Sequence, residues 1–249
     1  MYEIDIELSL GQHIVRIFLV LIVFIGVFLL IRNIDLYISP EDRETFMMAV
    51  FPERTSEEEL DRIRTTLVEI HAEEEGIGVP TDPTALAERT EEVLVTGSGE
   101  YVCPVVPGPD EVVSMTQGYG IGSHEPAEAW GAIDLAVKDR TGQAIVAPAG
   151  GLVKRITPGS WPAGNHIWLL VVTQDGPYLF GFSHLSSFTV SAGDIVQQGQ
   201  QIGVLGNTGK SYGSHLDFQM WTAYGEGMTA EKHINLNPLE YGFREACGI

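Results

Sequence analysis

A long run of apolar residues stands out near the start of this 249-residue chain. Every residue from Ile17 to Ile31 is apolar or glycine, and the run extends back to Ile14 across a single arginine. A helix rises about 1.5 Å per residue, so 18 residues cover roughly 27 Å, close to the hydrocarbon thickness of a bilayer. The pattern therefore predicts a membrane-spanning helix over residues 14–31, within an N-terminal membrane anchor formed by residues 1–40.

A cleaved signal peptide is the alternative interpretation of this run. Such a peptide would begin with basic residues, whereas the chain begins Met-Tyr-Glu-Ile-Asp-Ile-Glu, and no small-residue cleavage site follows the run. Arg16 and Arg32 flank its two ends, so the distribution of positive charge does not fix the orientation. We therefore expect an uncleaved, single-pass anchor whose orientation must be inferred from the domain that it carries.

The next segment, residues 41–100, is rich in acidic residues and shows a helical period. Ser56 and Glu59 form a capping box that predicts the start of a helix. A second short helix is predicted from Thr84 to Leu94. The stripe of apolar positions is narrow, so it suits packing against one partner helix or against the next domain, and we expect an acidic helical stalk and linker. The apolar positions of the first helix are Leu60, Ile63, Leu67 and Ile70.

From Tyr101 to the end, the pattern changes to short runs of branched and aromatic residues. Glycine, proline and asparagine interrupt these runs at short intervals, which is typical of an all-β domain in a sandwich or barrel arrangement. The segment from Gly193 to Gly203 suits a strand that bends back sharply on itself. We expect a mainly β, antiparallel domain over residues 101–249. Its clearest strand candidates are Val112–Thr116, Gln143–Ala147, Ile167–Val172 and Tyr178–His184.

The charge balance excludes one class of partner. A formal net charge of −20 argues against nucleic acid, because phosphate binding needs clustered lysine and arginine. The stretch from Gly206 to Ser211 looks like the end of a phosphate-binding loop, but the required first glycine is replaced by Val204. A strand-like sequence follows it, instead of the helix that such a loop needs. We therefore expect neither a nucleic-acid partner nor a nucleotide.

Two cysteines, Cys103 and Cys247, flank the C-terminal domain almost end to end. A disulfide between them is plausible in an oxidising compartment, and two unpaired buried thiols are an equally open alternative. Their number and spacing do not match a structural zinc site.

Several segments of the β domain, taken in order, resemble the lysostaphin/LytM-type zinc metallopeptidase family. The similarity covers nearly half of the chain, from about Pro104 to Met220. Each segment alone is a weak pattern, and their shared order and spacing carry the resemblance. The segments are Ala132–Ala136, Thr141–Val153, Phe182–Ser186 and Gly203–Met220.

The resemblance implies specific roles for individual residues. Asp134 would be a carboxylate zinc ligand, and His184 and His215 would be the catalytic histidines. The family's usual histidine ligand, four residues before the metal-binding aspartate, is absent, because Trp130 stands there. The segment that ends in Ser123-His124 resembles a variant pattern in which an earlier histidine supplies the missing nitrogen, so His124 is the candidate ligand.

A second departure from the family pattern lies in the segment Gly203–Met220. This segment resembles a family signature that normally ends His-Leu-His-Phe. Its final histidine, a zinc ligand in the family, is replaced here by Asp217. A set formed by His124, Asp134 and Asp217 meets the ligand count and atom types of a catalytic zinc site. Two carboxylates neutralise the dication, however, so we expect reduced activity or a preference for a harder metal. His166 matches no ligand position and is predicted to be only a strand-face residue.

Together with the predicted membrane anchor, the resemblance implies a membrane-anchored bacterial zinc metallopeptidase that hydrolyses peptide cross-links of cell-wall peptidoglycan, with its C-terminal domain extracytoplasmic. The stalk helix could also bind a protein partner. The alternative is a catalytically degenerate domain that binds cell wall or activates a partner hydrolase. In that case His124 would be an ordinary loop residue, and His184 and His215 would persist as structural residues.

Overall fold

The computed structural model describes residues 56–94, 101–138, 141–174, 176–223 and 233–249, which all lie in one unit of the chain, residues 52–249. The membrane helix predicted at 14–31, with the whole anchor of residues 1–40, lies outside the described residues. Among the residues that are described, no helix is long and apolar enough to cross a membrane.

Two helices begin the described part, α3 (Glu57–Glu75) and α4 (Pro83–Val93). The hydroxyl of Ser56 accepts a hydrogen bond of 3.1 Å from the backbone N–H of Glu59, as the capping box predicts. Gly76 ends α3 in the left-handed conformation, with φ of 69°. Both helices predicted in the stalk are therefore confirmed.

Helix α3 packs against the β domain through its apolar stripe. The ammonium of Lys154 lies 2.7 Å from a carboxylate oxygen of Glu59. The side chain of Leu67 lies so close to Gly150 that a Cβ at this glycine would be 2.8 Å from it. Packing against the next domain, one of the two uses foreseen for the stripe, is seen, and α3 also contacts α4. The buried residues of α3 are Leu60, Ile63, Leu67, Val68 and Ala72.

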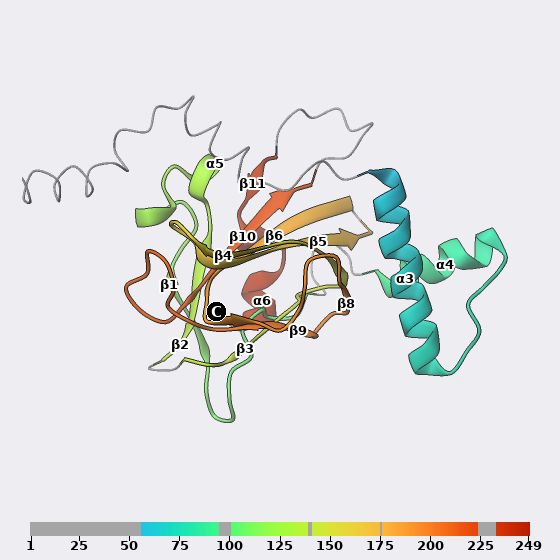
Figure 1. The fold of residues 1–249 in the computed structure, drawn as a ribbon, viewed down its shortest axis with the longest axis horizontal. Coiled ribbons are helices and arrows are strands. Elements are labelled where there is room, and N and C mark those ends of the chain that lie inside the picture. Colours follow the sequence, from blue (N-terminus) through green and yellow to red (C-terminus); the bar gives the residue numbers. More distant parts are fainter. Residues whose placement is uncertain (1–55, 95–100, 139–140, 175, 224–232) are drawn as a thin grey trace, which may run out of the picture. The chain divides into compact units, whose positions relative to one another are not determined.

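The described strands form two antiparallel sheets (Figure 1). The larger has the order β1-β2-β10-β6-β5-β4-β8, with β11 paired to β10, and the smaller has the order β3-β9-β7. The larger sheet consists of β1 (Val113–Gln117), β2 (Ile133–Val137), β4 (Gly151–Ser160), β5 (Gly164–Thr173), β6 (Gly176–Leu185), β8 (Ile195–Val196), β10 (Leu216–Thr222) and β11 (Asn235–Leu236). The smaller sheet consists of β3 (Ala144–Val146), β7 (Ser187–Phe188) and β9 (Gln201–Val204). Short helical turns are η2 (Gly122–His124), α5 (Ala127–Trp130), η3 (Pro238–Glu240) and α6 (Phe243–Cys247).

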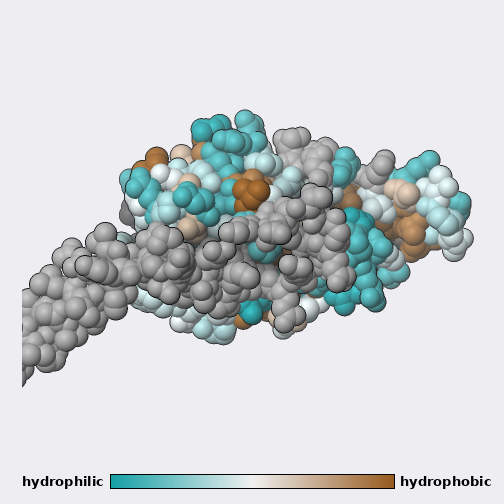
Figure 2. Space-filling model, turned by 90° about the horizontal axis from the view of Figure 1, so that it is seen from above, coloured by the Kyte–Doolittle hydropathy of each residue, from teal (hydrophilic) through white to brown (hydrophobic). Residues whose placement is uncertain are grey.

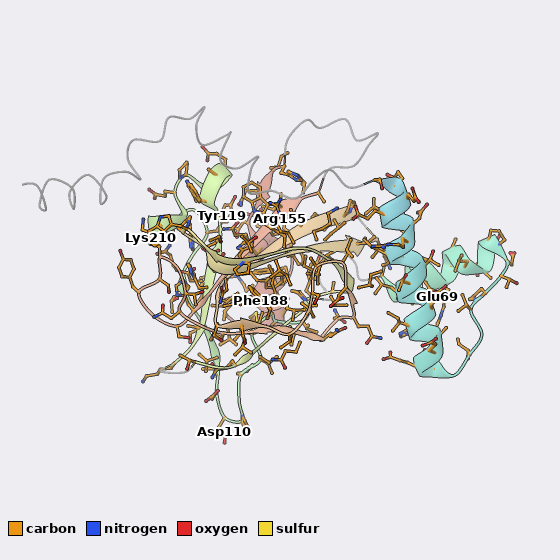
Figure 3. The ribbon with its side chains drawn as sticks, viewed as in Figure 1. Glu69, Asp110, Tyr119, Arg155, Phe188 and Lys210 are labelled. Carbon is orange, nitrogen blue, oxygen red and sulfur yellow. A yellow bond between two sulfur atoms is a disulfide. The ribbon has the colours of Figure 1, made fainter. Side chains whose placement is uncertain are left out.

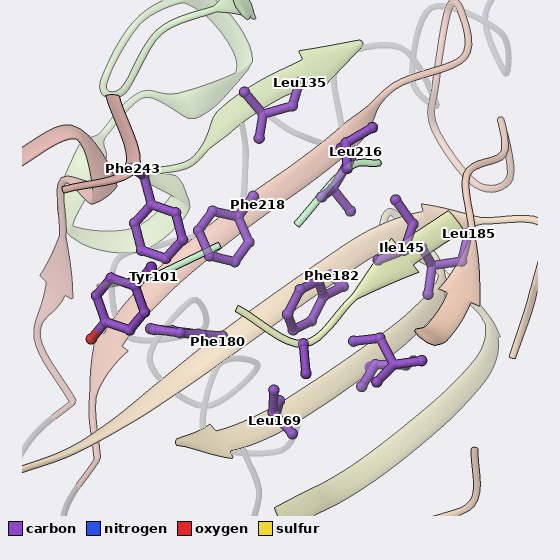
Figure 4. Packing of buried hydrophobic residues seen from close by; sticks show 14 of the residues in the cluster. Tyr101, Leu135, Ile145, Leu169, Phe180, Phe182, Leu185, Leu216, Phe218 and Phe243 are labelled. Atoms are coloured by element: carbon purple, nitrogen blue, oxygen red, sulfur yellow. The ribbon is translucent and has the colours of Figure 1, made fainter. Parts of the chain in front are cut away.

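The hydrophobic core lies between the two sheets. Alternate residues of β6 and β10 point into it, and Phe180, Phe218 and Phe243 pack there with Tyr101 (Figure 4). Ile145 and Ile202 bring the smaller sheet into the same cluster. The predicted mainly β, antiparallel fold is confirmed. Because the other residues of the central strands point to the opposite face, that face of the larger sheet is where polar side chains can gather.

One strand prediction was wrong. The segment from Gly193 to Gly203 does not form a single bent strand but two strands in different sheets. Strand β8 pairs with β4 of the larger sheet, whereas β9 pairs with β3 and β7 of the smaller one. The reason is a tight turn at Gly199, whose φ of 77° suits glycine and which reverses the chain.

Cys103 and Cys247 form a disulfide across a sequence separation of 144 residues. Of the two alternatives left open by the sequence, the bonded one is seen. The bond ties the first segment of the β domain to α6.

Loss of this disulfide is expected to destabilise the chain. Closing so long a loop removes much conformational freedom from the unfolded chain, which typically stabilises a protein by about 2–5 kcal/mol. The double variant Cys103→Ser with Cys247→Ser should therefore unfold at a clearly lower urea concentration than the parent. The parent measured under reducing conditions should match the variant. Equal midpoints for oxidised parent and variant would show that the bond contributes nothing.

Candidate metal and catalytic site

Two acidic residues lie side by side on the face of the larger sheet that points away from the core. Asp134 of β2 is directly opposite Asp217 of β10. Their neighbours Leu135 and Leu216 belong to the core, so the alternation of a strand turns both carboxylates to the opposite face. Asp134 is buried and Asp217 nearly so. Two carboxylates are thus held next to each other by strand register alone.

A loop brings His124 to these carboxylates. The side chain amide of Gln117 donates a hydrogen bond of 2.7 Å to the hydroxyl of Ser123, within the turn η2. Nδ1 of His124 lies 3.1 Å from the carbonyl oxygen of Gly118. Since a carbonyl only accepts, Nδ1 carries the proton in that bond, which leaves Nε2 to face the acids. The side chain is almost fully buried, with 3% exposed.

The three side chains converge on one point. Nε2 of His124 lies 3.2 Å from Oδ1 of Asp134 and 3.5 Å from Oδ2 of Asp217. One ligand atom from each residue lies within 4.8 Å of the others. Oδ1 of Asp134 is buried without a well-aligned hydrogen bond among the described residues, and a cation at this point would compensate its charge. These residues fit a zinc ion, which takes three nitrogen and oxygen ligands and keeps a fourth position open.

The charges of this cluster change the pKa values of His124 and Asp217. Burial lowers the pKa of His124, but the adjoining carboxylates of Asp134 and Asp217 more than offset this and raise it to about 10. Burial acts to raise the pKa of Asp217, and the neighbouring His124 outweighs it, so the net shift is downward. Without a metal, the cluster is therefore an ion pair network in which His124 holds a proton.

Binding of zinc is expected to release this proton. Zinc binds neutral imidazole, so the proton on His124 competes with the metal at any pH below about 10. The apparent affinity should therefore rise about tenfold per pH unit between pH 7 and 9. Calorimetric titration of the metal-free chain with zinc, in buffers of different ionisation enthalpy, should give about one proton released at pH 7. Binding that is independent of pH and buffer would contradict this account of His124.

Two further histidines lie beside the cluster. The rings of His184 and His215 are 4.8 Å apart, and Nε2 of His215 lies 3.6 Å from Oδ1 of Asp134. Nδ1 of His184 lies 2.7 Å from the carbonyl oxygen of Thr208, and Nδ1 of His215 lies 2.8 Å from that of Gly213. Both Nδ1 atoms therefore act as donors, and each Nε2 is left for chemistry. Burial is the main cause of a lowered pKa at His184.

All five site residues predicted from the sequence are thus brought together, although their roles stay predictions. The structure adds others that the sequence did not suggest. The hydroxyl of Ser183 and the amide of Gln219 donate to Oδ1 of Asp217 at 3.3 and 3.2 Å. Nδ1 of His166 lies 3.1 Å from the hydroxyl of Ser183. His166 does lie on a strand face, as predicted, but it is the face that carries the site. The sequence signal that could have pointed to these residues is the alternation of polar residues with core residues along β6 and β10.

Exposed apolar side chains occur on the loops around the site. Ile121, Trp161 and Tyr212 are 60%, 65% and 96% exposed. They lie in the loop that carries His124, in the β4–β5 hairpin and in the loop before His215. On the face shown in Figure 2, the described surface is mostly hydrophilic, with small hydrophobic patches. Exposed apolar side chains beside a polar site are well placed to contact a bound molecule.

Comparison with known proteins identifies the domain that holds this site. Residues 128–235 match peptidase family M23. This part of the chain is a peptidase family M23 domain. The match includes Asp134, His184, His215 and Asp217, whereas His124 lies just before it. The resemblance to lysostaphin/LytM-type peptidases is confirmed by lysostaphin of Staphylococcus staphylolyticus, which is 32% identical over 117 residues.

The similar regions are short compared with the whole relatives. The lysostaphin match covers 46% of this chain and 24% of that protein. A peptidoglycan DD-endopeptidase of Vibrio cholerae, ShyA, is 38% identical over 58 residues, 23% of this chain and 13% of that protein. Among solved structures, the catalytic domain of a mutant of the prophage-encoded M23 protein EnpA from Enterococcus faecalis is 24% identical. It covers 58% of this chain and 99% of that domain, with a TM-score of 0.43.

Proposed function

We propose that this M23 domain is a zinc metallopeptidase that hydrolyses peptide cross-links of cell-wall peptidoglycan. The observation that carries the proposal is the convergence of His124, Asp134 and Asp217 within 4.8 Å, beside a pair of histidines. The substrate class is supported by family M23 and by the relative named as a peptidoglycan endopeptidase.

In this proposal, Nε2 of His124 and one oxygen each of Asp134 and Asp217 would hold the metal. When bound, zinc would supply a water of lowered pKa and a Lewis acid for the scissile carbonyl. The two carboxylates leave little net positive charge at the site, so the protein's own hydrogen-bond donors must contribute more to stabilising an oxyanion.

We assign different roles to the two histidines. Burial lowers the pKa of His184, so this residue is neutral at pH 7 and its Nε2 can accept a proton from the attacking water. Nε2 of His215 lies 3.6 Å from Oδ1 of Asp134, at the edge of the candidate metal cluster. From this position the ring would stabilise the oxyanion that forms in the transition state. Ile121, Trp161 and Tyr212 would contact the peptide on either side of the scissile bond.

We further propose that residues 14–31 anchor the protein in the cell membrane and that the M23 domain is extracytoplasmic. The sequence supports the anchor through its long apolar run. The disulfide between Cys103 and Cys247 supports the location, because such bonds persist in oxidising compartments. Labelling of an added cysteine near Ile249 by an impermeant reagent in whole cells tests the orientation, and labelling only after lysis contradicts it.

The second candidate function is that of a degenerate domain that binds cell wall or activates a partner hydrolase. One observation favours it, since Asp217 replaces a histidine ligand of the family pattern. Release of cross-link peptides from purified peptidoglycan separates the two candidates. The enzyme proposal predicts release by the full chain, its loss with a chelator and its return on adding zinc. Binding to peptidoglycan without any release, with or without zinc, supports the second candidate instead.

A further inference from the structure

A row of polar side chains extends from the acidic pair across neighbouring strands. Asp134 of β2 is opposite Asp217 of β10, which is opposite Ser183 of β6. The hydroxyl of Ser183 in turn meets Nδ1 of His166 of β5 at 3.1 Å. Four adjacent strands of one sheet thus contribute one residue each to a continuous row. Cross-strand neighbours of this kind fix each other's side chain positions.

The donors and acceptors of this row can be assigned from hydrogen-bonding capacity. An ionised carboxylate only accepts, so Ser183 uses its single proton for Oδ1 of Asp217. The hydroxyl oxygen must then accept from His166, whose Nδ1 therefore carries the proton. Nε2 of His166 is then the nitrogen without a proton, and it is buried without a hydrogen-bond partner among the described residues. The direction of the row is thus His166 to Ser183 to Asp217.

The two oxygens of Asp217 have different surroundings. Oδ1 accepts hydrogen bonds from Ser183 and from Gln219. Gln219 is itself held by the indole N–H of Trp221, which donates to its Oε1 at 3.2 Å. Oδ2 faces Nε2 of His124 at 3.5 Å. The hydrogen bonds therefore leave one oxygen, Oδ2, directed to the point where the three candidate ligands meet.

The imidazole of His166 is tightly confined. Only 4% of the residue is exposed, and its ring packs against the ring of Trp168 with centroids 4.6 Å apart. Gly181 makes room for both, because a Cβ there would lie 3.3 Å from Cε1 of His166 and 2.9 Å from the indole of Trp168. A side chain so confined loses little further freedom when it orders its neighbours.

We propose that His166 is a positioning residue that acts through Ser183 to hold Asp217 as a ligand through its Oδ2 atom alone. This inference rests on the proposed metal site. A carboxylate in place of an imidazole brings a second oxygen that must be satisfied and kept off the metal. The row that begins at His166 and the amide of Gln219 supply the hydrogen bonds that satisfy this second oxygen.

The test is zinc affinity of the full chain, measured by competition with a chromogenic chelator, together with absorption spectra of the cobalt-substituted chain. Ser183→Ala and His166→Leu should each weaken zinc binding about 10–100-fold, the usual effect of removing an outer hydrogen-bond partner of a ligand. Both should also shift the cobalt spectrum. His166→Asn should stay close to the parent, because its amide can place an N–H where Nδ1 stands. Thr173→Val, which removes another buried hydroxyl from β5, is the matched control.

The outcomes separate this inference from the proposed function. Weakened binding in Ser183→Ala and His166→Leu, with near-parent binding in His166→Asn and Thr173→Val, supports the positioning role. A parent that binds zinc and is matched by all four variants overturns the positioning role alone. A parent that binds neither zinc nor cobalt overturns both ideas. Circular dichroism and thermal unfolding show whether a variant has lost its fold. If His166→Leu has, the zinc affinities of His166→Asn and Ser183→Ala are compared instead, and they decide whether the positioning role holds.

Discussion

Replacing Asp134 with asparagine is expected to abolish zinc binding and to lower peptidoglycan hydrolysis by about 10³-fold or more. The substitution keeps the size of the side chain but removes the buried negative charge that lies 3.2 Å from His124. A metal contributes several kcal/mol of transition-state stabilisation, and about 4 kcal/mol corresponds to a factor of about 10³. Zinc content after dialysis and initial rates of peptide release measure the effect.

A matched substitution controls for the loss of a carboxylate elsewhere. Asp110 lies exposed in the loop before β1, outside the ligand cluster (Figure 3). Its φ of 63° is one that asparagine also tolerates. Asp110→Asn should keep parental zinc content and rate. If Asp134→Asn retained stoichiometric zinc and a parental rate, Asp134 would not be a ligand.

The second large effect is expected at His184. His184→Asn should lower the hydrolytic rate by about 10²–10⁴-fold while zinc affinity stays near that of the parent, because this residue is proposed as a base and not as a ligand. Asparagine suits this position for two reasons. It tolerates the left-handed backbone of His184, with φ of 65°, and its amide can still donate to the carbonyl of Thr208.

The control for this variant is His233→Asn. His233 is another partly buried histidine, bonded through Nδ1 to the carbonyl oxygen of Thr222 and placed outside the ligand cluster. Its substitution should leave rate and zinc affinity unchanged. A His184→Asn chain that hydrolyses at the parental rate would remove His184 from the mechanism, whereas one that loses zinc would make it a ligand.

The local elements of this fold could be predicted because their signals are local. The cap at Ser56, the apolar stripe after it and the glycine at 76 lie within one segment, and together they define α3. The runs of branched and aromatic residues that form β5 and β6 are likewise visible within each segment. The segment around Gly199 was misread because the choice between one bent strand and two strands depends on distant pairing partners.

The candidate site was predictable only where a family pattern names the residues. Asp134, His184 and His215 follow from that pattern, and His124 follows from a variant of it. Nothing in their spacing shows that the loop with His124 closes over the two acids. The place of His166 in the site was missed for the same physical reason, since its partner Ser183 is set by the register of β5 with β6 and by a bulge near residue 166.

The central claim is that His124, Asp134 and Asp217 together hold one zinc ion. X-ray absorption at the zinc edge of the reconstituted full chain tests it most directly. The account predicts one zinc per chain, bound by a single imidazole nitrogen and carboxylate oxygens at about 2.0–2.2 Å, without sulfur. A chain that takes up no zinc, or a spectrum with two or more imidazoles, would contradict it.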